Sequence, residues 1–177
     1  MTGSLTSTVQ LDARQRRVAI IAARFNASLV DQLIAGATQA WRDHGGEPSR
    51  LLLERVPGAF ELPLAAKMFA ASGGVDAVIA LGCVIRGDTP HFQFVAGECA
   101  RGLMDAGLAT GVPVIFGVLT TETQGQAEER ADLTRMNKGR ESMEAALEMI
   151  QLLAPPARTP RVPRAAKRLA KTRARKR

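Results

Sequence analysis

The segment AVIALGCVIRGDTPH (Ala77–His91) decides the fold of this chain. It opens with a short apolar run, Ala77–Leu81, which predicts a strand, and it continues through a glycine-bearing loop, Gly82–Pro90. A helix is predicted to follow, from about His91 to Asp105. A strand, a loop and a helix in this order form the repeating unit of α/β proteins.

The same unit occurs on both sides of this segment. Val18–Ala23 is β-branched and apolar on both faces, which is typical of a buried strand in a parallel sheet. Two more strands are predicted at Leu51–Val56 and Val112–Leu119. The remaining helices are predicted from Asn26 or Ser28 to His44, from near Pro63 to Gly73, from Thr121 or Thr123 to about Asp132 and, after a break at Asn137–Gly139, from Ser142 to Leu153. This alternation predicts an α/β fold in which a four-stranded parallel sheet has helices on both faces.

The composition excludes several classes of protein. With 177 residues, the chain is long enough for one domain of about 150 residues and a tail. Its longest apolar runs, Ala77–Ile85 and Val112–Leu119, are shorter than the ~18 residues of a membrane-spanning helix, and its first residues contain no signal-peptide pattern. The two cysteines, Cys83 and Cys99, form no disulfide framework, so we expect a cytoplasmic protein.

The basic charge is concentrated at the C-terminal end. Of the 24 Lys and Arg residues, ten lie from Ala154 onward, where there is no Asp or Glu. Residues 1–153 therefore carry 14 basic and 17 acidic side chains, a net charge of −3. We predict a flexible N-terminal arm at 1–16, a folded domain at 17–153 and a basic, disordered tail at 154–177. The tail could bind nucleic acid weakly by charge, but it has no aromatic residue for base stacking.

Familiar cofactor and metal motifs are absent from the sequence. It contains no GxGxxG, GxxxxGK[ST], GxSxG or HExxH pattern, and its histidines and cysteines lack the spacing of metal ligands, so we expect neither a cofactor nor a metal. Chemistry is expected instead in the loops at the carboxyl ends of the strands, where parallel sheets bind ligands. Four such loops carry aromatic and polar side chains: Arg24–Asn26, Val56–Glu61, Gly82–His91 and Thr120–Thr123.

Each candidate side chain also has an ordinary structural explanation. His91 could cap a helix, Glu61 could be an acidic residue in the first turn of a helix, and Arg130 could be a solvated ion-pair residue. The convergence of their loops on one edge of one sheet is what favours a functional site.

Several long motifs between residues 17 and 153 occur in the order and with the spacing found in one known protein family. They are RFN (Arg24–Asn26), VPGAFELPLAAK (Val56–Lys67), ALGCVIRGDTPHFQFV (Ala80–Val95), GVPVIFGVLTTET (Gly111–Thr123), Glu129-Arg130 and Asn137-Lys138-Gly139. In these motifs the chain resembles the 6,7-dimethyl-8-ribityllumazine synthase family of riboflavin biosynthesis. One departure is Asp132–Met136, a loop that is commonly glycine-rich in the family and contains no glycine here.

The resemblance implies a flavodoxin-like three-layer sandwich and a transferase without a cofactor. Such an enzyme condenses 5-amino-6-(D-ribitylamino)uracil with 3,4-dihydroxy-2-butanone 4-phosphate and releases phosphate and water, the penultimate step of riboflavin synthesis. The resemblance also implies a homopentamer with active sites between subunits, leaves a decamer or a 60-subunit shell open, and suggests riboflavin synthase as a partner. The alternative is an oligomeric scaffold whose basic tail binds nucleic acid.

The resemblance further implies roles for individual residues. His91 is the expected catalytic residue, because an imidazole both gives and takes protons near neutral pH. Phe25 is expected to stack on the pyrimidine. The ribityl chain is expected to contact Asn26, Ala59, Phe60 and Glu61, and the uracil edge the main chain of Cys83, Val84 and Ile85. The phosphate is expected to lie on Gly87, Asp88, Thr89 and Arg130. The adjacent subunit is expected to supply Phe116, Arg130 and Lys138.

Overall fold

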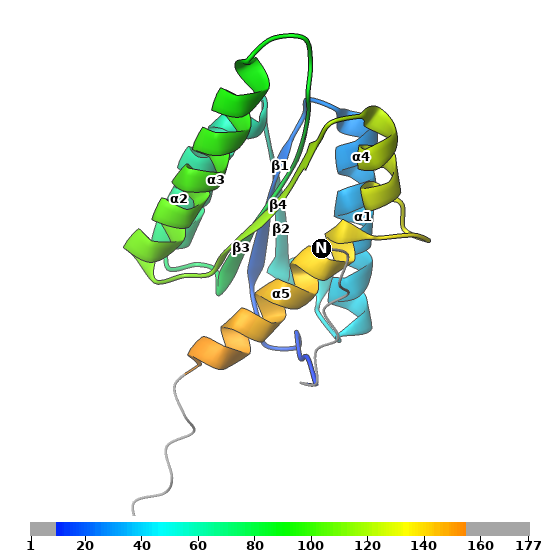
Figure 1. Cartoon of the computed structure of the whole chain (residues 1–177). Helices are drawn as coiled ribbons and strands as arrows, with labels where there is room; N and C mark the ends of the chain where they lie inside the picture. Colours follow the sequence, from blue (N-terminus) through cyan, green and yellow to red (C-terminus); the bar gives the residue numbers. More distant parts are fainter. Residues whose placement is uncertain (1–9, 155–177) are drawn as a thin grey trace, which may run out of the picture.

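Four parallel strands form the central sheet of the computed structural model, which describes residues 10–154. They are β1 (Val18–Ala23), β2 (Leu51–Val56), β3 (Ala77–Ile85) and β4 (Val114–Thr121), in the spatial order β2-β1-β3-β4 (Figure 1). β1 pairs with two neighbours, so that Ile20 lies opposite Leu53 on one side and Ile79 on the other. After β1 the chain adds β2 on one side of it, and then adds β3 and β4 on the other side. The order in which strands are added therefore reverses between β1 and β3, although all four strands are parallel.

Helices cover both faces of this sheet. α1 (Ala27–Asp43), α4 (Gln124–Ala131) and α5 (Lys138–Leu153) lie on one face, and α2 (Leu62–Ala71) and α3 (His91–Thr110) lie on the other (Figure 1). Two short 3₁₀ turns, η1 (Pro48–Arg50) and η2 (Ala59–Glu61), flank β2. The predicted three-layer α/β sandwich is confirmed, and within the described residues no helix is both long and apolar enough to cross a membrane.

The continuous apolar run of β1 is explained by two separate cores. Val18, Ile20 and Ala22 pack into the core beneath α1 and α5, whereas Ala19 and Ile21 pack into the core beneath α2 and α3. All five side chains are buried, as alternation across a sheet covered on both faces requires.

Two elements are longer than predicted. β3 extends to Ile85, beyond the predicted end at Leu81, because its pairing with β4 continues until Ile85 lies opposite Thr121. α3 continues to Thr110 and ends at Gly111, whose φ of 69° is one that glycine adopts readily. The extension of β3 places Gly82–Ile85, predicted as loop, on a rigid strand.

The predicted break at Asn137–Gly139 is wrong, because these residues begin α5. Asn137 adopts a left-handed conformation with φ 44°, and its side-chain oxygen accepts a hydrogen bond from the Arg140 N–H at 3.1 Å. Gly139 is buried against α1, where an added Cβ would lie 2.0 Å from the carbonyl oxygen of Leu33. The asparagine and the glycine therefore serve as a helix cap and a helix contact.

Part of the predicted N-terminal arm packs on the sandwich. Ala13 is buried and its N–H donates to the carbonyl oxygen of His44 at 3.0 Å, and Leu11 packs against the core beneath α1 and α5. Residues 1–9 of the predicted arm and residues 155–177 of the predicted tail lie outside the described residues.

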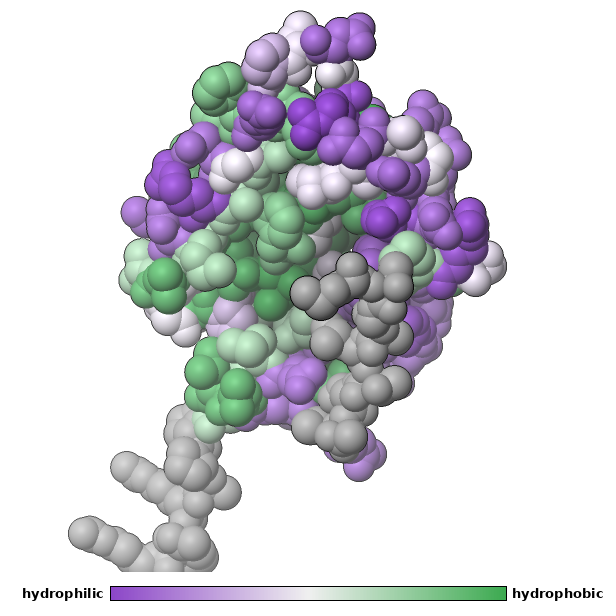
Figure 2. Space-filling model, viewed as in Figure 1, coloured by the Kyte–Doolittle hydropathy of each residue, from purple (hydrophilic) through white to green (hydrophobic). Residues whose placement is uncertain are grey.

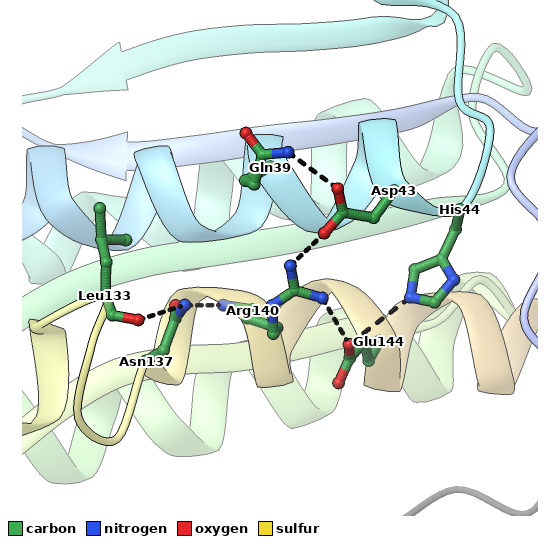
Figure 3. Close-up of polar contacts among 7 residues, drawn as sticks. All are labelled: Gln39, Asp43, His44, Leu133, Asn137, Arg140 and Glu144. Carbon is green, nitrogen blue, oxygen red and sulfur yellow. Dashed lines mark hydrogen bonds and ion pairs between the residues drawn. The ribbon is translucent and has the colours of Figure 1, made fainter.

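A chain of polar contacts joins α1 to α5 (Figure 3). Arg140 donates to the Asp43 carboxylate and, at 3.1 Å, to Glu144, whose Oε1 lies 3.5 Å from His44 Nε2. Gln39 donates to the other carboxylate oxygen of Asp43 at 2.8 Å. The hydrogen bond from Arg140 is the main reason why the pKa of Asp43 lies below its ordinary value of 3.8.

We expect Asp43→Asn to destabilise the fold near neutral pH and to have little effect in acid. Because the pKa of Asp43 is lower in the folded than in the unfolded protein, its contribution is complete above the ordinary value of 3.8 and is lost as the pH falls through the folded value. Urea unfolding of both proteins from about pH 7 to about pH 2 measures this effect. A midpoint difference that stays constant into acid would contradict the assigned role of the Arg140 contact.

Candidate active site

A pocket of about 670 Å³ opens at the carboxyl ends of β1, β2 and β3. It lies where the order of the sheet reverses, which is the usual ligand position in parallel sheets. The structure thus brings together ten of the residues expected to act on substrate: Phe25, Ala59, Phe60, Glu61, Cys83, Val84, Ile85, Gly87, Thr89 and His91.

Two phenylalanines in this pocket are unusually exposed. Phe25 is 70 % exposed and Phe60 is 59 % exposed, although burial of a phenyl ring is strongly favourable. Phe25 is held in place because the main chain continues to pair beyond β1, with the Phe25 N–H donating to the carbonyl oxygen of Pro57 at 3.1 Å. Rings that are fixed by the backbone and open to solvent can stack on a flat ligand.

Asn26 and Glu61 each use one polar atom to support the pocket wall. Asn26, with φ 58°, donates from Nδ2 to the carbonyl oxygen of Cys83 at 2.9 Å and is not itself one of the lining residues. The Gly58 N–H donates to Glu61 Oε2 at 2.9 Å. Within residues 10–154, Asn26 Oδ1 and Glu61 Oε1 have no hydrogen-bond partner, so each oxygen can bind a substrate hydroxyl.

The thiol of Cys83 in the pocket has low reactivity. Cys83 is buried, and burial raises the pKa of its thiol to about 11. The thiol is therefore neutral at physiological pH and is a poor nucleophile. Cys83 can still offer its main chain to a ligand, because β3 runs along the pocket wall.

His91 is the first residue of α3 and is exposed. The loop before it contains Gly87 and Thr89 in the lining and Asp88, which is exposed outside it. An added Cβ at Gly87 would meet nothing within 4 Å, so there is open space beside the loop. Because the first N–H groups of a helix have no intrahelical partner, this end of α3 favours an anion such as phosphate.

Three other predicted substrate-binding residues lie in a second pocket, whereas Asn26 and Asp88 line neither pocket. Phe116, Arg130 and Lys138 line a hollow of about 330 Å³ along β4, α4 and α5, and this hollow shares no lining residue with the first. Arg130 donates to the carbonyl oxygen of Gln126 at 2.9 Å and forms no ion pair with an acidic residue in the described part of the chain. Lys138 pairs with Glu141 at 2.6 Å.

Sequence reasoning missed some of the pocket lining. Pro57, Gly58, Phe92, Phe94 and Val95 also line the first pocket. The spacing of Phe94 and Val95, three and four residues after His91, could have placed them on the same helix face. Among residues 10–154, no group of three or more His, Cys, Asp or Glu side chains is arranged to hold a metal ion.

A sequence model of one family, described as 6,7-dimethyl-8-ribityllumazine synthase, matches residues 15–154. The chain belongs to this family. Three proteins named 6,7-dimethyl-8-ribityllumazine synthase are among its relatives. The one from Thermus thermophilus is 51 % identical over 143 residues (81 % of this chain, 91 % of the relative). Those from Nitratidesulfovibrio vulgaris and Halorhodospira halophila are 50 % and 54 % identical over 144 and 137 residues (81 % and 77 % of this chain, 92 % and 88 % of the relatives).

Membership of the lumazine synthase family, together with the fold, confirms four of the predictions. The family, the α/β fold and the enzyme class are as expected, and the chain is a transferase of riboflavin biosynthesis that forms 6,7-dimethyl-8-ribityllumazine.

Proposed function

We propose that the pocket at the carboxyl ends of β1, β2 and β3 is where the ribitylaminouracil and the phosphorylated dihydroxybutanone react. The exposed ring of Phe25 stacks on the pyrimidine, and the main chain of Cys83–Ile85 binds the uracil edge. The free oxygens of Asn26 and Glu61, with Ala59 and Phe60, bind the ribityl chain. Two exposed rings beside fixed polar groups suit a flat, polyhydroxylated substrate.

The phosphate of the ketone binds at the N-terminal end of α3. Gly87, Asp88 and Thr89 supply main-chain N–H groups there, and the open space beside Gly87 leaves room for the anion. A guanidinium completes the site, because an arginine can bind a phosphate with two parallel hydrogen bonds. Arg130 is available for this role, since no carboxylate in the described chain pairs with it.

His91 moves protons between the reacting groups. When the pyrimidine amine attacks the ketone carbonyl, a hydroxyl must be protonated to leave as water, and the later loss of phosphate requires removal of a proton from carbon. An exposed imidazole beside the phosphate loop can accept and return these protons.

We base the proposal that each active site is shared between two subunits on the separation of the two pockets. Within one chain, Phe116, Arg130 and Lys138 line a hollow of their own, apart from the pocket that holds His91. A neighbouring copy that places its second hollow against the first pocket would complete the site. Figure 2 shows hydrophobic surface over the part of the molecule near α3 and β4, which suits such a contact. The exposed apolar side chains there and on α2 are Leu64, Met68, Phe94, Met104, Leu108 and Phe116.

We propose a homopentamer, the size that the family resemblance implies, in the cytoplasm, where the two buried free cysteines of the described chain would stay reduced. The domain is proposed at 17–153, with Leu11 and Ala13 of the preceding segment packed against it and a basic tail after it. Riboflavin synthase, which would consume the product, is the proposed protein partner. The scaffold with a nucleic-acid-binding tail remains the less favoured alternative.

Arg130→Ala should mainly weaken binding of the phosphorylated ketone. Loss of one charge-assisted contact costs about 1.5–3 kcal/mol, or roughly 10- to 150-fold in affinity. Titration of each substrate separately measures the effect, and the affinity for the ribitylaminouracil should change much less. Arg130→Lys should restore only part of the loss, because an ammonium group cannot form the planar fork. Equal weakening of both substrates would assign Arg130 a structural role.

The shared site is tested by mixing two impaired variants, His91→Ala and Arg130→Ala, and measuring activity at a concentration of the phosphorylated ketone too low to saturate Arg130→Ala. If Arg130 acts in a neighbour's pocket, rings assembled from an equal mixture contain sites that pair an intact His91 with an intact Arg130. Each half of the site is intact about half the time, so about a quarter of the sites should regain full activity.

Each variant denatured and refolded alone is the control for this mixing experiment. Activity of the mixture equal to the average of the two parents would show that each site belongs to one chain.

A further inference from the structure

Arg86, just after β3, makes three contacts that the proposed site does not use. Its main-chain N–H donates to the carbonyl oxygen of Thr121 at the end of β4, at 2.9 Å. Its Nε lies 2.5 Å from Glu122 Oε2, an ion pair across 36 residues of sequence. Its guanidinium carbon lies 4.3 Å from the centre of the Phe92 ring, a cation–π contact.

These contacts involve residues on both sides of Gly87–Thr89, the loop proposed to bind phosphate. Ile85 and Gly87 line the pocket, but Arg86 between them is not one of the lining residues. Phe92, in the first turn of α3, does line the pocket. Arg86, which directly precedes the loop, thus contacts Phe92, which directly follows His91. Through Glu122 it also contacts the connection between β4 and α4.

We propose that Arg86 is a positioning residue for the phosphorylated ketone, and that it acts through Phe92 and Glu122. It holds Gly87–Thr89 in the arrangement that binds phosphate before the substrate arrives. A loop that is free must be ordered during binding, and the lost conformational entropy lowers the affinity. This inference rests on the proposed function of the loop.

Direct binding of phosphate by Arg86 predicts the opposite effect at Glu122. If the guanidinium bound the phosphate itself, removing the Glu122 carboxylate would free a cation and remove a nearby negative charge, so the affinity for the anion would rise. If Arg86 only positions the loop, the same change releases one of its anchors, and the affinity falls because this loss outweighs the small gain from removing an exposed, screened charge. The sign of the change at Glu122 therefore separates the two roles.

The experiment compares wild type with Arg86→Ala, Arg86→Lys, Glu122→Ala and Glu47→Ala. Glu47→Ala is a matched control, because the Arg50–Glu47 pair lies before β2 and its side chains are 32 % and 56 % exposed, against 36 % and 60 % for Arg86 and Glu122. The readouts are KM for each substrate, Kd for inorganic phosphate by calorimetry and the thermal midpoint.

Arg86→Ala should raise KM for the phosphorylated ketone and Kd for phosphate by roughly 5- to 20-fold, and Glu122→Ala by roughly 3- to 5-fold. KM for the ribitylaminouracil should stay within about twofold, as should every value for Glu47→Ala. Arg86→Lys should recover part of the loss, because lysine keeps the charge and loses the planar stacking. A merely structural role would move the thermal midpoint without separating the two KM values.

Two results would overturn the inference. If wild type binds inorganic phosphate and Glu122→Ala binds it equally well or more tightly, Arg86 does not position the loop, while the assignment of the loop stands. If wild type makes product but phosphate does not bind in competition with the phosphorylated ketone, the assignment of the loop fails and the inference fails with it.

Discussion

His91→Ala should slow turnover by about 10²-fold or more, because general acid–base help is typically worth ~10²–10⁴ in rate. The lower end is expected, since this condensation also proceeds slowly without an enzyme. The side chain is exposed, so its removal should leave the fold intact. Single-turnover measurements with both substrates bound separate the chemical step from substrate binding.

The other histidine provides the control for this prediction. His44 lies between α1 and α5, near Glu144, and is outside both pockets that contain the proposed site residues. His44→Ala should therefore turn over at the wild-type rate. A wild-type rate for His91→Ala would remove His91 from the chemistry.

Gly139→Ala should prevent stable folding. An added Cβ would lie 2.0 Å from the carbonyl oxygen of Leu33 and 2.9 Å from its Cα, and neither backbone atom can move without shifting α1. Overpacking typically costs 1–3 kcal/mol, and a contact with rigid backbone should cost more than about 3 kcal/mol, a large share of the stability of a domain. Circular dichroism and urea unfolding measure the loss.

Gly125 provides the matched control for Gly139. It lies in α4, and an added Cβ would meet nothing within 4 Å. Gly125→Ala should leave the stability unchanged or raise it by up to about 1 kcal/mol, since alanine favours helix. If Gly139→Ala unfolds at the wild-type urea concentration, α1 and α5 are not in the close contact described.

The sequence was sufficient for the order of elements because the apolar patterns are long and unambiguous. Leu29, Leu33, Ala37 and Trp41, for example, are spaced four residues apart, which is typical of one face of a helix, and all four are buried in α1. The end of β3 was missed because it depends on pairing with β4, a contact distant in sequence. Local signals at glycine and asparagine were ambiguous for a related reason, since the same residues can stop a helix, cap it or allow a close contact.

The loops of the site could be located from the sequence, but the arrangement of their side chains could not. The rule that ligands bind at the carboxyl ends of parallel strands brought the loops of Phe25, Glu61 and His91 to one edge, where the structure has them in one pocket. The same rule could not assign Phe116 and Arg130 to a different hollow, because that depends on how α4 and α5 pack beside β4. The family resemblance supplied that division between subunits.

If one active site is divided over the hollows of two subunits, as proposed, the rate depends on gene dosage in a nonlinear way. Under the proposed assembly, an isolated subunit carries a first pocket that lacks Arg130 and holds its own Arg130 in a separate hollow. At low abundance most chains are separate, so doubling the amount of protein more than doubles the number of complete sites, by mass action. Once nearly every chain is in a ring, the response becomes proportional. A cell that makes this chain would therefore form 6,7-dimethyl-8-ribityllumazine above a threshold of expression.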